Sequence, residues 1–161
     1  MHTVCPDKSA GDKIKTAIHD FEGDQTYSEK RGHDFVLNAS FADAKPDAYD
    51  AVMIAGGRAP EYLRLDKRVI AIVRVFAAAE KPIAAIYHAA QILAAADVIR
   101  GCRVSAYAAT APEVRLAGGE YVETAPDGAL CDGNLVTGFA WPAHPRFLAL
   151  FLDALGTRVV L

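Results

Sequence analysis

The sequence predicts an α/β fold, a sandwich of helices around a mostly parallel sheet. Two short apolar runs, residues 50–55 and 81–86, are each followed by turn-forming or polar residues. Near-continuous apolar character over about five residues is typical of strands covered on both faces. Residues 66–80, between the two runs, place apolar side chains on one side and basic ones on the other, which predicts an amphipathic helix. Strands that alternate with helices at this spacing indicate helices packed on the faces of one sheet.

The elements that follow fit the same fold. Residues 88–99 are rich in alanine and leucine and predict a helix that ends near Arg100 and Gly101, a pair typical of a C-terminal cap. Three short elements come next: a strand at 103–106, a helical turn at 111–117 and a strand at 120–122. The turn at 132–134 then predicts a hairpin. The last helix is expected over 144–155, capped by Gly156.

The beginning of the chain carries weaker signals. Residues 2–5 match a short strand, whereas residues 19–29 are polar and turn-rich, which predicts a short irregular hairpin. No repeat, low-complexity segment or linker interrupts the sequence. A chain of 161 residues with 52% apolar residues can form one core, so we expect a single domain over residues 1–161.

Composition argues against several classes of protein. The sequence has 17 basic and 20 acidic residues, a net charge of −3, and the basic residues are scattered. This pattern gives no basic cluster that would bind nucleic acid or a membrane surface. No apolar stretch approaches the roughly 20 residues that span a bilayer. Three cysteines and five histidines are dispersed, with no spacing typical of a metal or redox site. We therefore expect a cytoplasmic protein without metal or cofactor.

Two conspicuous segments follow the predicted strands. One is GGRAPEYL, from Gly56 to Leu63, and the other is IYHAAQIL, from Ile86 to Leu93. They resemble the signature segments of the ThiJ/PfpI superfamily, within the class I glutamine-amidotransferase-like proteins, whose usual forms are PGGRAPEYLR and ICHGPQLL. Further matches are HDFEGDQTYSEK at 19–30, DGNLVTG at 132–138 and AWPAHP at 140–145. The resemblance runs from about Cys5 to the end of the sequence.

The resemblance implies a flavodoxin-like fold and a nucleophile elbow, a sharp strand-to-helix turn that presents one side chain at the sheet edge. Family members use a cysteine there, and their activities include glyoxalase or deglycase chemistry, amide hydrolysis and chaperone-like roles. In this sequence Tyr87 stands at the elbow. A phenol, with a reference pKa near 10, is mostly protonated at pH 7 and is a poor nucleophile. Either the site is repurposed or it is no longer needed.

A second departure concerns the start. Family members begin with a strand and helix of roughly 30 residues before the strand that matches residues 2–5. That first strand lies inside the sheet, and its end carries the acidic partner of the cysteine, so the fold is expected to lack both. A missing central strand leaves unpaired backbone groups. We expect a re-paired sheet, a gap filled by another subunit, or a sequence shorter than the natural protein, and we favour a homo-oligomer.

Five residues form the candidate site. Tyr87 is either a plug of the old pocket or an acid in a new reaction. His88 matches the family's catalytic histidine and is either a base or a structural residue. Glu61 matches a carboxylate that reaches a neighbouring subunit in oligomeric family members, although it also suits the first turn of a helix. Gly56 and Gly57 are expected to form a tight turn whose N–H groups offer an oxyanion site.

Other polar residues have structural interpretations. Cys102 and Cys131 lie off the elbow and are expected to be small buried fillers, and Cys5 is expected to be structural. The acidic residues Asp20, Glu22 and Asp24 could attract a cation, but a solvated loop is the favoured interpretation.

Three functions remain open. The leading hypothesis is a catalytically impaired homologue that acts as a binding or stress-associated protein. The second is a repurposed lyase, hydratase or glyoxalase-like enzyme that uses His88, Glu61 and Tyr87 on a small carbonyl compound. The third is a structural subunit completed by a partner chain.

Overall fold

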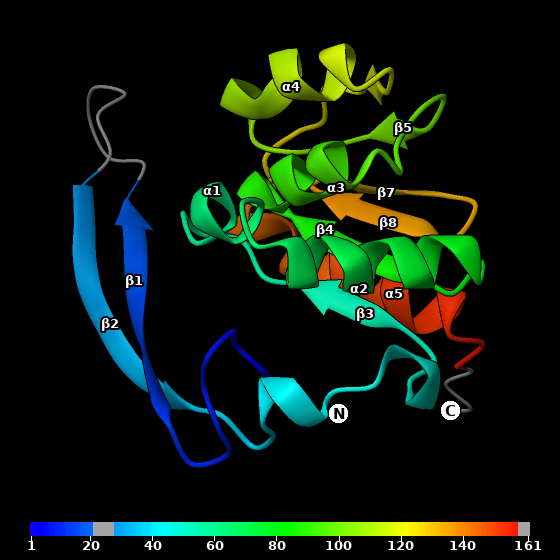
Figure 1. The fold of residues 1–161 in the computed structure, drawn as a ribbon. Helices are drawn as coiled ribbons and strands as arrows, with labels where there is room; N and C mark the ends of the chain where they lie inside the picture. Colours follow the sequence, from blue (N-terminus) through cyan, green and yellow to red (C-terminus); the bar gives the residue numbers. More distant parts are fainter. Residues whose placement is uncertain (21–27, 158–161) are drawn as a thin grey trace. The chain divides into compact units, whose positions relative to one another are not determined.

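The computed structural model describes residues 1–20 and 28–157, which divide into two compact units. The first is Met1–Ala48 and the second begins at Tyr49. Figure 1 shows the elements of both. The candidate site belongs to the second unit, so the first is described only briefly.

A long antiparallel hairpin dominates the first unit. Strand β1 (Lys13–Asp20) pairs with β2 (Ser28–Val36), and two short 3₁₀ helices follow, η1 (Phe41–Asp43) and η2 (Pro46–Ala48). The hairpin is longer and more regular than predicted, because strands rich in lysine and arginine give no apolar run to detect. Residues 21–27, with Glu22 and Asp24 of the acidic run, lie outside the described residues.

The strand predicted at residues 2–5 is wrong, since these residues form no strand. The Asn38 side chain provides the physical reason. The Thr3 backbone N–H donates to Asn38 Oδ1 at 2.7 Å, so it is not used in a strand ladder. Pro6 and the left-handed Asp7 (φ 60°) then turn the chain.

The second unit is built on a four-stranded sheet in the order β3-β4-β8-β7. Strands β3 (Val52–Ile54), β4 (Ile83–Ile86) and β8 (Leu135–Gly138) run parallel, and β7 (Ala129–Asp132) joins β8 as the predicted antiparallel hairpin. A separate parallel pair is formed by β5 (Arg103–Val104) and β6 (Glu120–Tyr121). The predicted α/β architecture with a mostly parallel sheet is confirmed.

The central strand β4 is covered on both faces, as its apolar run predicts. Ile83 and Ala85 pack into one core cluster, with helix α2 (Lys67–Ala78) and helix α3 (Ala90–Ala96). Ala84 and Ile86 pack into a second cluster, with helix α5 (His144–Ala154). Because successive residues of a strand point to opposite faces, these two clusters are the two layers beside the sheet.

The helices agree with the predicted segments with one correction. Helix α2 buries Ile70, Val73 and Phe76, and its N-cap Asp66 accepts from the Arg68 N–H at 2.8 Å. Hydrogen bonds from Arg68 hold the pKa of Asp66 at about 2. Helix α3, however, ends at Ala96, and Asp97 forms a left-handed cap (φ 55°), so the cap predicted near residue 100 is wrong. The backbone N–H of Asp97 bonds to the Ala94 and Leu93 carbonyl oxygens, so the left-handed residue ends the helix about one turn earlier.

Candidate functional site

Two turns meet beside the ends of the parallel strands β3 and β4. The first follows β3 and contains Gly56 and Gly57. A Cβ atom on Gly56 would lie 2.8 Å from the Tyr87 Cβ and 3.0 Å from the Ile86 carbonyl oxygen, so only glycine fits there. Gly57 adopts a left-handed conformation (φ 73°). The chain bends at Gly57, and the oxyanion role of the N–H groups of the two glycines stays a prediction.

The second turn follows β4 and places Tyr87 in a strained conformation. Ile86 is extended, Tyr87 has φ 64°, and the chain then enters 3₁₀ helix η3 (Tyr87–Ala89) and helix α3. This strand–turn–helix geometry is that of a nucleophile elbow. Left-handed backbone at a residue with a bulky side chain costs roughly 1–2 kcal/mol, a strain that concentrates at functional sites. The Tyr87 side chain is buried, with 5% exposure.

Tyr107 packs against both elbow side chains. Its ring centroid lies 4.7 Å from that of Tyr87 and 5.2 Å from that of His88, and it is stacked on the histidine at an interplanar angle of 16°. The Tyr87 and His88 rings are 4.4 Å apart. The elbow residues therefore lie in an aromatic enclosure, and His88 is only 4% exposed.

Glu61 and His88 come together from different elements. Helix α1 (Pro60–Leu63) carries Glu61, whose Oε1 lies 3.3 Å from His88 Nδ1. Arg58 holds the same carboxylate from the other side, since its Nε and Nη2 donate to Oε1 and Oε2 at 3.2 Å each. The Arg58 hydrogen bond, aided by the positive charges of Arg58, His88 and Arg64, lowers the pKa of Glu61 against the effect of burial. An ionised carboxylate is thereby held against an imidazole, an arrangement that can orient the ring and stabilise its protonated form.

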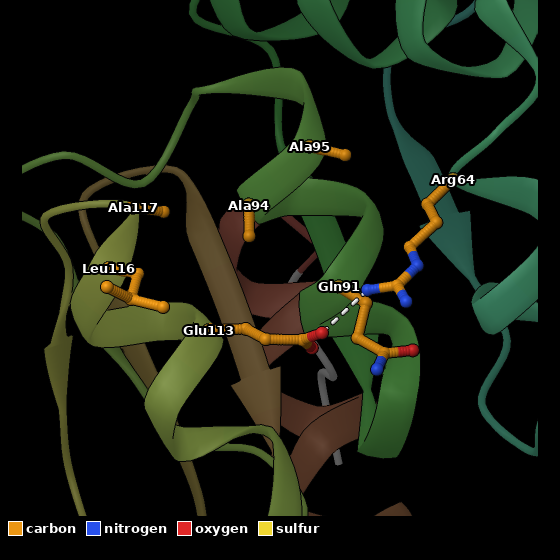
Figure 2. A pocket seen from close by; sticks show the side chains of 7 residues that line it. All are labelled: Arg64, Gln91, Ala94, Ala95, Glu113, Leu116 and Ala117. Atoms are coloured by element: carbon orange, nitrogen blue, oxygen red, sulfur yellow. Dashed lines mark hydrogen bonds and ion pairs between the residues drawn. The ribbon is translucent and has the colours of Figure 1, made fainter.

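A cavity of about 330 Å³ lies beside this site, between helices α3 and α4 (Ala111–Leu116). Figure 2 shows its lining residues, which are Arg64, Gln91, Ala94, Ala95, Glu113, Leu116 and Ala117. Arg64 Nη1 donates to Glu113 Oε1 across 2.6 Å. This ion pair joins residues 49 positions apart, and no sequence signal links them.

Sequence reasoning also missed Arg58 and Tyr107 as parts of the site. Arg58 could have been found, because it lies three residues before Glu61, the spacing of an ion pair on one helical turn. Tyr107 contacts the elbow only through the tertiary fold, and its position in the sequence carries no signal.

The three cysteines are not part of the elbow. Burial raises the pKa of Cys5, Cys102 and Cys131, which keeps the three thiols protonated and poorly nucleophilic. The prediction of a buried filler is wrong for Cys131, which is exposed and lies near the Gly133 carbonyl oxygen, at 3.2 Å. Cys131 is part of β7, an edge strand with one neighbour, and this explains its exposure.

Two further features concern ligands and membranes. Among the described residues, no group of three or more His, Cys, Asp or Glu side chains is placed to hold a metal ion. Within the same part of the chain, no helix has the length and apolar character needed to cross a membrane.

This chain is similar to known proteins both in sequence and in fold. It is 54% identical over 160 residues to the protein named DJ-1 homolog D of Arabidopsis thaliana, covering 99% of this chain and 41% of the relative. It is also 33% identical over 122 residues to Deglycase PH1704 of Pyrococcus horikoshii, covering 72% of each chain. The chain spans about two fifths of the length of the Arabidopsis relatives it matches.

Solved structures of similar fold point to the same family. A ThiJ/PfpI domain protein from Brachyspira murdochii superposes with a TM-score of 0.72 at 21% identity, covering 80% of this chain and 72% of that one. A two-domain protein from Anabaena variabilis, with DJ-1/ThiJ/PfpI-like and ferritin-like domains, superposes with a TM-score of 0.69 at 26% identity. The match covers 82% of this chain and 35% of that one. The flavodoxin-like fold is therefore confirmed. The DJ-1/PfpI family profile matches residues 5–154. This chain belongs to the DJ-1/PfpI family.

Proposed function

We propose that Tyr87 replaces the catalytic cysteine of the family and that the chain is a catalytically impaired homologue, acting as a binding or stress-associated protein. The observation that carries the proposal is the tyrosine at the elbow, left-handed at φ 64° and 5% exposed. A protonated phenol in that position accepts an acyl group or adds to a carbonyl carbon far less readily than a thiolate. The geometry of the elbow is retained, while its reactive group is a buried aromatic side chain.

The surroundings of Tyr87 support the same proposal. Its ring belongs to an apolar cluster with Ile86, Val136 and Phe147, in addition to its contact with Tyr107. A side chain packed in this way fills the space above the sheet edge instead of leaving it open for a substrate. The nearby Glu61 side chain is 25% exposed, which suits the binding of a polar ligand without covalent chemistry.

The test is consumption of methylglyoxal by the purified chain beside a Tyr87→Cys variant. We expect no turnover by the unmodified chain and measurable turnover by the variant, because a thiol would then occupy the elbow. A Tyr107→Cys variant is the matched control, since it adds a thiol beside the elbow and not on it. Turnover by the unmodified chain would overturn the proposal. If a folded Tyr87→Cys variant also consumes no methylglyoxal, the replacement of the cysteine alone does not explain the lack of activity.

A second candidate function is a lyase, hydratase or glyoxalase-like enzyme that works without a thiol. The distance of 3.3 Å between Glu61 and His88 favours it, because a carboxylate-oriented imidazole can move a proton on a carbonyl compound. Tyr87 would then donate a hydrogen bond. If methylglyoxal or a related carbonyl compound is consumed, His88→Ala and Glu61→Gln should each abolish turnover, whereas Cys131→Ala should leave it intact.

We further propose that both units belong to one domain and that the chain forms a homo-oligomer. The family profile supports the first point, because its match at 5–154 extends through both units. Exposed apolar side chains in the second unit, among them Tyr62, Leu65 and Trp141, support the second. Light scattering after size-exclusion chromatography tests the oligomer, and a monomeric mass would contradict it.

A further inference from the structure

Helix α1 carries Glu61 but is too short to be stable by itself. It has four residues, and its N-cap Ala59 provides no side-chain cap. Isolated helices of this length are not populated in water, because the free energy cost of nucleation exceeds the stabilisation from the hydrogen bonds of a single turn. The position of Glu61 therefore depends on what attaches α1 to the rest of the second unit.

Arg64 provides the polar attachment at the C-terminal end of α1. Its backbone N–H donates to the Pro60 carbonyl oxygen at 3.1 Å and closes the helical turn. Its guanidinium group donates through Nε to the carbonyl oxygen of Glu61 at 3.3 Å and through Nη1 to Glu113 at 2.6 Å. One side chain thus binds the backbone of Glu61 and the side chain of Glu113 on α4.

The partner is firmly placed. Val114, the residue after Glu113, is completely buried, and Ala111 at the start of α4 is 6% exposed. Glu113 Oε2 is buried and has no hydrogen-bond partner among the described residues, so Arg64 is the group that neutralises this carboxylate. At 34% and 35% exposure, the two side chains are partly shielded from solvent, which strengthens the ion pair relative to one on an open surface.

The space between α3 and α4, next to Arg64 at the end of α1, is not filled by side chains. Both members of the ion pair line the cavity of about 330 Å³, together with small alanine side chains (Figure 2). Side chains of this size leave the space between the helices unfilled. The ion pair adds a polar attachment to the apolar contacts of α1, in which Pro60 is fully buried and Leu63 packs against the core of the second unit.

We infer that the Arg64–Glu113 ion pair is a clasp that positions Glu61 against His88. The clasp holds α1 on α4, and with it the backbone of Glu61, while Arg58 sets the direction of the carboxylate. Arg64 and Glu113 are positioning residues, since Glu113 binds Arg64 and Arg64 binds the backbone carbonyl oxygen of Glu61. The inference deepens the proposed role of the site in binding and rests on it for its functional meaning.

The experiment follows the Glu61 carboxyl group by ¹³C NMR during a pH titration, in the unmodified chain and in Glu113→Ala. If the clasp positions Glu61, its titration midpoint rises toward the ordinary value in the variant, because the carboxylate is less well held by Arg58 and His88. Amide exchange of residues 61–64 should become about fivefold faster, while exchange in α2 is unchanged. Glu113→Gln, whose amide oxygen can still accept from Arg64, should show a smaller effect.

Arg115→Gln is the matched control, because Arg115 is on the same helix but lies over the Tyr121 ring, 5.3 Å from its centroid. It should leave the Glu61 titration unchanged. An unchanged midpoint in a folded Glu113→Ala variant would overturn the clasp, whatever the methylglyoxal assay shows. Equal acceleration of exchange in α1 and α2 would also overturn it, since the ion pair would then serve general stability. If the midpoint shifts but the proposed function fails, the clasp stands as a positioning device for a different activity.

Discussion

Replacing Gly56 with alanine perturbs the closest approach between the two turns of the candidate site. The added Cβ would lie 2.8 Å from the Tyr87 Cβ and 3.0 Å from the Ile86 carbonyl oxygen, both below ordinary contact. Neither atom is the end of a flexible side chain, so the backbone must move. Overpacking of this kind costs about 1–3 kcal/mol. We expect Gly56→Ala to lower the free energy of unfolding by about 2 kcal/mol, or the Tm by roughly 4–8 °C for a domain of this size.

Urea denaturation followed by far-ultraviolet circular dichroism measures the effect. Gly57→Ala is the control, because no atom lies within 4 Å of its added Cβ and only the backbone conformation (φ 73°) opposes it. That cost is about 1 kcal/mol. In a Tyr87→Gly background one of the two clashes disappears, so Gly56→Ala should cost at least about 0.5 kcal/mol less. Equal costs for the two glycines, together with no coupling to Tyr87, would refute the reasoning.

Two other predictions concern charge and core packing. Arg58→Gln should raise the pKa of Glu61, which ¹³C NMR measures. In the unmodified chain the folded-state pKa lies below the ordinary 4.5, so the ionised carboxylate stabilises the native state above pH 4.5. This contribution is lost as the pH falls through the folded-state pKa. The variant should therefore lose less stability on acidification, and an identical pH profile would contradict this. Leu93→Ala, at a completely buried position, should cost about 2–5 kcal/mol in urea denaturation, whereas Leu116→Ala, at an 87% exposed position, should cost under about 0.5 kcal/mol.

Apolar patterning was sufficient to predict the elements around the core of the second unit. The run at 81–86 contains β4, the amphipathic segment at 66–80 contains α2, and the turn at 132–134 joins β7 to β8. These patterns are reliable because each element buries a continuous strip of side chains, and burial constrains which residue types can occur there. The same reasoning fails for the hairpin of β1 and β2, whose strands carry many charges.

Helix boundaries depended on interactions that the pattern does not contain. Residues 88–99 predict one helix, but α3 begins only at Ala90, after the elbow and one 3₁₀ turn, and it ends at the left-handed Asp97. Alanine and leucine favour helix throughout this segment. The elbow packs closely against Gly56, and a sequence pattern cannot anticipate such a contact between two segments.

Residue chemistry at the candidate site is visible in the sequence, and its geometry is not. The order of Gly56, Glu61, Tyr87 and His88 along two strand–turn segments identifies the family and its candidate residues, since turns after parallel strands gather at one sheet edge. The distance of 3.3 Å between Glu61 and His88, the stacking of His88 on Tyr107 and the clasp arise only when helices from separate parts of the chain pack together. Electrostatic strength depends on distance and burial, which are properties of that packing.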